Sequence, residues 1–403
     1  MTAAPAGSPM RILFVNDGVG DAGGVQRYLE AVAGAMRRRG HAIALLHLDR
    51  LRAPDDSPVG AEAAHFCIAE LGTERAVAAA VSWRPTVVFS HNMRALDADR
   101  LLCARAPVVK MMHAYSGTCI GAQKMHSFPR RVACDRRFGF GCVLLYFPRH
   151  CSEGSVHALA SHYAWAREQR AIWDGYRRVI VASDHMRREY ERNGIPAGRL
   201  ATNPLFASDV PAQPAPAPQE FGILFLGRMT ALKGGDQLVR AAHLASRQIG
   251  QPVRLTMAGD GPARRAWERL SATLGVNAEF PGWVTGTRRD ALYHAASLVA
   301  VPSLWPEPFG LTGLEAGAHG VPAVAFDVGG IRAWLRDGEN GWLVDPRSGA
   351  RGMARALVEA WNNPAGLAER RSGARRVAER LSLDRHVTAL ETLLAEAGRE
   401  AAT

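Results

Sequence analysis

Short apolar segments rich in Val, Ile and Leu recur along the whole chain, and amphipathic segments of helical length separate them. This alternation predicts parallel sheets with helical crossovers, because a parallel strand that helices cover on both faces is apolar throughout. We expect strands at 11–16, 42–48, 86–90, 107–112, 178–182, 222–226, 253–258, 278–280, 298–301 and 322–325. A final amphipathic helix is expected at 384–398.

One segment interrupts this pattern and divides the chain. Residues 207–219, ASDVPAQPAPAPQ, alternate proline with small residues, which predicts an extended linker. The expected fold class is therefore α/β, with two doubly wound Rossmann-like domains facing a central cleft. The N-terminal domain takes residues 1–206 and the second domain residues 220–380. A helix within 381–403 is expected to pack back toward the N-terminal domain.

An irregular insert at 114–160 departs from the pattern and holds four of the six cysteines. It is too long for an ordinary connection, so it is either a lid or a small metal-stapled subsite. Cys119, Cys134, Cys142 and Cys151 contain no C-x-x-C pair, which is a poor match to standard zinc modules. Unrelated thiols, a structural zinc site that includes nearby histidines, and disulfides remain the alternatives.

Composition agrees with a soluble globular protein, since 47% of the 403 residues are apolar and 22% are charged. No apolar run reaches the ~18 residues of a membrane span, and the first ten residues lack the features of a signal peptide. We therefore expect a cytoplasmic protein whose cysteines are thiols or metal ligands.

The net charge of +11 arises almost wholly before residue 206. This excess predicts either a solvated basic surface or peripheral contact with an anionic inner membrane leaflet. The arginines are not interleaved with stacking aromatic residues, which argues against nucleic acid as a partner. Only three of the 49 basic residues are lysines, namely Lys110, Lys124 and Lys233.

Two cations follow a predicted strand in the segment GILFLGRMTALKGG at 222–235. Gly227 allows the chain to turn, and Arg228 and Lys233 then project from a short loop before a helix that starts near Asp236. Fixed cations beside a glycine turn and a helix N-terminus form a site for a diphosphate. The alternative is two solvated surface cations.

Two carboxylates frame a second loop in the segment VPSLWPEPFGLTGLEAG at 301–317. Prolines hold Glu307 in an extended turn, whereas Glu315 lies about two turns into the helix that Gly310 begins. The helix N-terminus offers N–H groups to a phosphate, and the carboxylates can accept hydrogen bonds from sugar hydroxyls. The alternative is a capping glutamate and an exposed one.

With these motifs in place, the second half resembles the donor domain of retaining GT-B glycosyltransferases of family 4, the glycosyl transferases group 1. The resemblance is carried by G-R-x4-K-G at 227–234, A-G-D-G-P at 258–262, F-P-G-W-V at 280–284, E-P-F-G-L-T-G-L-E-A at 307–316, G-V-P-A-V at 320–324, G-G-I at 329–331 and D-G-E-N-G-W-L-V at 337–344. The N-terminal half matches more loosely, best at 23–41, and the segment 113–160 departs from the commoner members.

The resemblance implies a donor site. Arg228 and Lys233 would bind the diphosphate and neutralise the leaving group. Glu307 would accept from hydroxyls of the transferred sugar, and Glu315 from the ribose. The remaining donor-binding residues implied are Gly23 and Gly24 at the N-domain loop, Trp283 and Val284 at the base, and the backbone amides of Phe309, Gly310, Leu311 and Thr312. His113 matches the histidine beside the donor sugar, and its alternative role is a core histidine.

The implied reaction is retaining transfer without a metal or other cofactor. The donor would be a nucleotide-diphosphate sugar, with UDP or GDP as the nucleotide. The acceptor would be a glycan, a lipid-linked molecule or a small molecule, as in polysaccharide biosynthesis. A nucleotide- or carbohydrate-binding protein with a degenerate site is the alternative from another class.

Two weaker motifs point elsewhere. Residues 18–23, GVGDAG, fit the G-x-G-x-x-G of dinucleotide-binding domains, which leaves an NAD(P)-dependent oxidoreductase as a further alternative. Asp97 and Asp99 resemble a D-x-D pair that holds Mg²⁺ in other sugar transferases. We interpret that pair instead as the start of a solvated helix.

Overall fold

The computed structural model describes residues 8–18, 23–51, 57–152, 154–207, 211, 218 and 220–400. The chain divides into two compact units, each described here by itself. Unit N comprises Met1–Lys124, Asp135–Pro204 and Leu383–Thr403, and unit C comprises Met125–Cys134 and Leu205–Ser382. Most of the predicted linker at 207–219, and residues 19–22 of the glycine motif, lie outside the described residues.

Unit N is built on a seven-stranded parallel sheet with the order β3-β2-β1-β4-β5-β8-β9. Its strands are β1 (Arg11–Asn16), β2 (Ala42–His47), β3 (Ala64–Cys67), β4 (Val87–Ser90), β5 (Val108–Met112), β8 (Arg178–Val181) and β9 (Leu200–Thr202). Strand order reverses between β1 and β4, the kind of point at which doubly wound sheets bind ligands. β4 and β5 are buried along their whole length, as their apolar sequences require.

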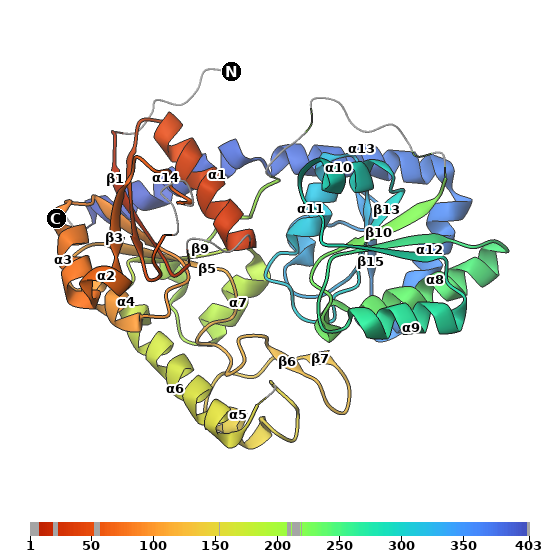
Figure 1. Cartoon of the computed structure of the whole chain (residues 1–403), viewed down its shortest axis with the longest axis horizontal. Helices are drawn as coiled ribbons and strands as arrows, with labels where there is room; N and C mark the ends of the chain where they lie inside the picture. Colours follow the sequence, from red (N-terminus) through yellow and green to blue (C-terminus); the bar gives the residue numbers. More distant parts are fainter. Residues whose placement is uncertain are drawn as a thin grey trace. The chain divides into compact units, whose positions relative to one another are not determined.

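The helices of unit N include one from the far end of the chain. They are α1 (Gly24–Arg38), α2 (Ile68–Leu71), α3 (Thr73–Ser82), α4 (Leu96–Cys103), α5 (Phe140–Leu145), α6 (Val156–Ile172), α7 (Asp184–Arg192) and α14 (Leu383–Arg399). In Figure 1, α14 (blue) lies beside α1 (red). Tyr28 Oη on α1 lies 2.9 Å from His386 Nε2 on α14, and His41 Nε2 lies 2.7 Å from Glu391 Oε1. These contacts attach α14 to α1 and to the residue that precedes β2.

The insert has a small core of its own. Ile120, Tyr146 and Leu159 are buried together, and Phe138 and Tyr163 pack against them. This core joins α5 to α6, the two yellow helices of Figure 1. A two-stranded antiparallel hairpin, β6 (Met125–His126) with β7 (Val132–Ala133), belongs to unit C.

Unit C is built on a six-stranded parallel sheet with the order β12-β11-β10-β13-β14-β15. Its strands are β10 (Gly222–Leu226), β11 (Arg254–Ala258), β12 (Ala278–Gly282), β13 (Leu298–Val301), β14 (Ala323–Phe326) and β15 (Gly341–Val344). Its helices are α8 (Gly235–Ile249), α9 (Arg264–Leu274), α10 (Gly286–His294), α11 (Leu311–Ala318), α12 (Gly349–Asn362) and α13 (Pro364–Arg380). The prediction of two doubly wound parallel α/β sheets is confirmed.

All ten expected strands are present within one or two residues of their predicted bounds. Beyond these ten, the structure has β3, β9 and β15 in the two parallel sheets and β6 and β7 in the hairpin, none of which was predicted. β3 and β9 have only four and three residues, too few to show a period. Across the described residues, every helix is too short or too polar to cross a membrane.

Candidate functional site

A glycine-lined turn follows the central strand of unit C. Gly227 has φ +156° at the end of β10, and a Cβ on the neighbouring Gly259 would lie 2.0 Å from the Gly227 carbonyl oxygen. Met229 is buried and donates its N–H to the Asp260 carbonyl over 2.7 Å. Because these contacts fix the backbone on both sides of it, Arg228 projects outward and is exposed. Within the described residues Arg228 forms no ion pair.

Lys233 and Glu307, predicted separately to bind a donor, lie against each other. Lys233 Nζ is 2.7 Å from Glu307 Oε1 and also lies 5.6 Å from the centre of the Trp305 ring. The same carboxylate oxygen accepts a short hydrogen bond from Ser303 Oγ. The Glu307 side chain is only 6% exposed, whereas that of Lys233 is 31% exposed. The lysine therefore neutralises a buried carboxylate and still reaches solvent.

The loop that carries Glu307 is held by a close backbone approach. Gly329 has φ +57°, and a Cβ there would lie 2.3 Å from the Glu307 carbonyl oxygen. The Gly330 N–H donates to the same oxygen over 2.7 Å. Any larger residue at 329 would push the loop away, which explains the glycine at this position.

The first turn of α11 is left open. Gly310 is its N-cap, with φ +85°, and no side chain caps the helix. Trp334 Nε1 donates to the Phe309 carbonyl over 2.7 Å, and a Cβ on Gly313 would meet the Trp334 ring at 2.0 Å. The N–H groups that begin a helix have no partner inside it. The prediction of a phosphate contact at 309–312 rests on these N–H groups and stays a prediction.

The other residues of unit C that are predicted to bind the donor lie in different environments. Tyr293 Oη donates to Glu315 Oε2 over 3.2 Å, which fixes that carboxylate on α11. Trp283 is 57% exposed directly after β12, and Val284 beside it is 9% exposed. An exposed indole beside a buried valine offers a flat apolar surface, which is the requirement for contact with a nucleobase.

In unit N, the predicted residues lie at the start of α1 and just after β5. Gly23 is the N-cap of α1 and Gly24 its first residue, and a Cβ built on Gly24 would meet nothing within 4 Å. His113 follows β5, and its Nε2 lies 3.0 Å from His91 Nδ1. The Tyr28 ring packs edge-on against His113 at 5.4 Å.

Burial controls the charge of these histidines. Burial, with the Lys110 charge as a second cause, lowers the pKa of His113 to about 3. Burial likewise lowers the pKa of His91 well below its ordinary value and that of His386 to about 4. At neutral pH His113 is therefore an uncharged hydrogen-bonding group rather than a cation.

The D-x-D pair is not a metal site in this structure. Asp99 is fully buried, with Lys110 Nζ at 2.6 Å, Ser90 Oγ at 2.7 Å and Tyr176 Oη at 2.8 Å. Asp97 is exposed and pairs with Arg100 over 2.7 Å. The expectation of a solvated pair was therefore wrong for Asp99, which neutralises a buried lysine at the sheet.

The structure does not bring the insert cysteines together on a metal. Among the described residues no three His, Cys, Asp or Glu side chains are placed to hold one ion, so the zinc hypothesis for Cys119, Cys134, Cys142 and Cys151 finds no site. Cys142 Sγ and Cys151 Sγ instead lie near the carbonyls of Arg137 and Leu145 at 3.7 and 3.6 Å.

Several residues of this site escaped the sequence analysis. Ser303, Trp305, Tyr293 and Trp334 each hold a predicted residue in place. Ser303 and Trp305 lie within the same segment as Glu307, and that proximity was the available signal. Tyr293 and Trp334 are distant in sequence, and only the fold places them.

Two family models match the chain. The model described as Glycosyltransferase Family 4 covers residues 22–205, and the model described as Glycosyl transferases group 1 covers residues 220–363. Together they include almost every element of both sheets.

Curated relatives match part of the chain. The D-inositol 3-phosphate glycosyltransferase of Rhodococcus erythropolis is 38% identical over 174 residues, which is 41% of this chain and 39% of that protein. The protein of the same name from Salinispora tropica is 40% identical over 192 residues, 44% of this chain and 39% of that protein. The aligned part thus spans about two fifths of the length of these relatives.

Solved structures match nearly the whole chain in fold. Anabaena HepE in complex with UDP and glucose has a TM-score of 0.69 at 19% identity, covering 96% of this chain and all of that one. Sucrose-phosphate synthase from Thermosynechococcus elongatus has a TM-score of 0.69 at 20% identity, covering 98% and 100%. These likenesses show the GT-B fold.

Proposed function

The chain belongs to glycosyltransferase family 4, and we propose that it transfers a sugar from a nucleotide-diphosphate sugar to an acceptor, with retention and without a metal. The observation that carries this proposal is the arrangement around Lys233. An exposed arginine, a lysine and an uncapped helix N-terminus all stand at the carboxyl ends of β10 and β13. This is the charge pattern that a diphosphate requires.

Arg228 and Lys233 would act on the leaving group. As the bond between the sugar and the β-phosphate breaks, its electron pair goes to the phosphate oxygen, where negative charge grows. Cations and N–H groups already fixed there stabilise this charge more than the ground state and so lower the barrier. The departing phosphate oxygen would take the proton of the acceptor hydroxyl, which attacks on the same face.

Glu307 would hold the transferred sugar. One of its oxygens receives Lys233 and Ser303, and a carboxylate has about four acceptor positions, so sugar hydroxyls can join the existing partners. Glu315 would accept from the ribose, and Trp283 would cover the base. His113, neutral at pH 7 for the reason given above, would contribute a hydrogen bond to the donor sugar.

The proposals for the nucleotide and the acceptor rest on the names of similar proteins. A UDP complex of a protein with the same fold supports UDP ahead of GDP. The aligned relatives carry inositol 3-phosphate in their names, which supports a small polar acceptor alongside glycan and lipid-linked molecules. A role in polysaccharide biosynthesis fits each of these.

The test is slow hydrolysis of a nucleotide sugar without acceptor. Purified protein is incubated with UDP-glucose and GDP-mannose, and release of the nucleotide is followed, while thermal shifts with UDP, GDP and ADP identify the bound nucleotide. Arg265 on α9 is exposed, so Arg265→Ala is the matched control for Arg228→Ala. Nucleotide binding without release from any donor would favour a non-catalytic binding protein instead.

A membrane is proposed as a peripheral partner because of an apolar face on the insert. Phe140, Leu144 and Phe147 are 69%, 63% and 44% exposed; the first two lie one turn apart on α5, and Phe147 lies in the turn that follows it. Arg136 and Arg137, just before them, are exposed as well. Apolar side chains beside cations suit an anionic leaflet, where each nearby cation contributes about 1 kcal/mol. This contact would place the protein on the cytoplasmic face of the membrane.

A further inference from the structure

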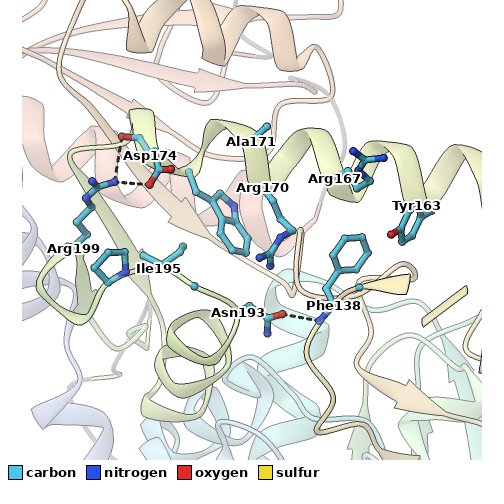
Figure 2. Close-up of a pocket in the computed structure, with 13 residues that line it drawn as sticks. Phe138, Tyr163, Arg167, Arg170, Ala171, Asp174, Asn193, Ile195 and Arg199 are labelled. Atoms are coloured by element: carbon cyan, nitrogen blue, oxygen red, sulfur yellow. Dashed lines mark hydrogen bonds and ion pairs between the residues drawn. The ribbon is translucent and has the colours of Figure 1, made fainter. Parts of the chain in front are cut away.

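Unit N contains a pocket of about 440 Å³ that shares no residue with the donor set. It lies between the end of α6, the segment that follows α7, and Phe138 of the insert (Figure 2). The lining is both cationic and aromatic, a combination that the proposed transfer does not explain.

Arg170, near the end of α6, is the central cation. Its guanidinium lies 4.8 Å from the ring centre of Trp173 and 5.7 Å from that of Phe138. Figure 2 shows its side chain extending from the helix toward Phe138. Contact with aromatic faces uses the flat sides of a guanidinium and leaves its N–H groups, which lie in the plane, for other partners.

Those N–H groups lack an acceptor. Nη1 of Arg170 is buried without a hydrogen-bond partner in the described part of the chain, and no carboxylate there pairs with this arginine. Burial lowers the pKa of Arg170, since the charge is partly removed from water. A partly buried cation without a counterion is less well solvated than one in water, so an anion at this point would be favoured.

A second donor lies beside it. Trp173 is 5% exposed, and its Nε1 has no hydrogen-bond partner among the described residues either. Gly117 packs closely against the Trp173 ring, since a Cβ at position 117 would lie 2.5 Å from it. An indole N–H normally finds a partner when buried.

The rest of the rim keeps the pocket positive. Arg167 and Arg199 both line it, and the one carboxylate in the lining, Asp174, is engaged by Arg199 over 3.2 Å. Asp174 is therefore unavailable to Arg170, and the lining carries more cations than anions.

The opposite wall is aromatic and fixed. The Phe138 and Tyr163 rings lie 5.1 Å apart at 31°, packed on the insert core of Ile120, Tyr146 and Leu159. The Phe138 N–H donates to Asn193 Oδ1 over 2.8 Å, and Asn193 is itself held by the Glu189 carbonyl. Aromatic faces of this kind suit the C–H face of a sugar ring, which is apolar and flat.

We propose that this pocket binds a saccharide that carries an acidic group. The carboxylate, phosphate or sulfate would meet the guanidinium of Arg170, and the sugar ring would lie against Phe138 and Tyr163. This proposal does not depend on the proposed donor site, because the two share no residue.

The test measures binding of glucuronate and of glucose 6-phosphate, with glucose and inorganic phosphate as comparison ligands, by calorimetry at millimolar concentration. The two sugar acids distinguish a carboxylate from a phosphate ligand. We expect Arg170→Met to weaken the preferred sugar acid at least tenfold, whereas Arg105→Met, at an exposed position of the same unit, leaves it unchanged. Phe138→Leu should weaken the sugar acid and leave inorganic phosphate unaffected.

Two variants separate this pocket from the donor site. Arg228→Ala should lose nucleotide binding and keep the sugar acid, whereas Arg170→Met should do the reverse, which also shows that each variant is folded. Unchanged affinity in Arg170→Met, or glucose bound as tightly as the sugar acids, would overturn the proposal. Inorganic phosphate bound as tightly as glucose 6-phosphate would overturn the saccharide part of it.

Discussion

Replacing Lys233 should damage both turnover and folding, whereas replacing Arg228 should damage turnover alone. Each substitution removes a cation from the growing charge of the leaving group, with an expected loss of about 10²–10³ in kcat, or roughly 3–4 kcal/mol. The sequence alone predicts that stability hardly changes in either variant, because both side chains are expected to face the cleft. In the structure the two variants are expected to differ in stability.

The difference comes from Glu307. Its side chain is 6% exposed and its ion pair with Lys233 is 2.7 Å long. A hydrogen bond to a charged group contributes about 1.5–3 kcal/mol, and Lys233→Ala leaves the carboxylate buried with less compensation. In a unit of this size, about 2 kcal/mol lowers Tm by roughly 4–8 °C. Arg228→Ala should change the free energy of unfolding by no more than about 0.5 kcal/mol.

The assay is differential scanning calorimetry together with donor hydrolysis, for both variants and for Lys233→Ala combined with Glu307→Gln. The second substitution removes the buried charge and keeps an acceptor for Ser303, so it should restore most of the lost stability and none of the activity. Equal Tm for the two single variants, or no recovery in the double variant, would refute the role given to this ion pair.

Three further expectations follow from the same geometry. Measured by calorimetry, Glu307→Gln should weaken binding of the intact donor and leave binding of the free nucleotide nearly unchanged, whereas Glu315→Gln should weaken both. An equal effect of Glu307→Gln on the two ligands would show that Glu307 does not contact the sugar. The buried neutral histidines His91, His113 and His386 have folded pKa values below the unfolded value near 6.5, so the unfolded state takes up protons first as pH falls. The free energy of unfolding of unit N should then be constant above pH 6.5, and below that pH it should decrease by about 1.4 kcal/mol per pH unit for each histidine. Urea unfolding at pH 7.5 and 5.5 would measure this decrease, which should be smaller in His386→Asn. Transfer should continue in EDTA, and a strict need for Mg²⁺ or Mn²⁺ would contradict the proposed mechanism.

The sequence predicted the sheets well because apolar segments of five or six residues leave few alternatives to buried parallel strands. It also identified Arg228, Lys233, Glu307 and Glu315 as parts of a donor site, and that assignment stays a prediction. It did not indicate which carboxylate each lysine pairs with in the folded protein. All three lysines of this arginine-rich chain neutralise buried carboxylates, at Asp99, Glu189 and Glu307, over 2.6–2.8 Å.

The reason lies in distance along the chain. Lys110 and Asp99 are eleven residues apart, but Lys233 and Glu307 are separated by 74. A local pattern cannot show which carboxylate a lysine will meet after folding. Asp99 was placed on a solvated helix for this reason, and the cation–aromatic pocket of unit N was not foreseen at all.

The position of α14 has a consequence for how the protein is made. Unit N needs Leu383–Arg399 to complete the contacts of Tyr28, Arg39 and His41, yet these residues leave the ribosome after every strand of unit C. Unit C, which comes second in the sequence, therefore has all its strands available while unit N still lacks a helix. Domains usually fold in order from the N-terminus during synthesis, whereas here the unit translated second is the first to have all its strands and helices. A chain that stopped before Leu383 would thus keep every strand of both sheets but lose the contacts of α14 in the unit that was translated first.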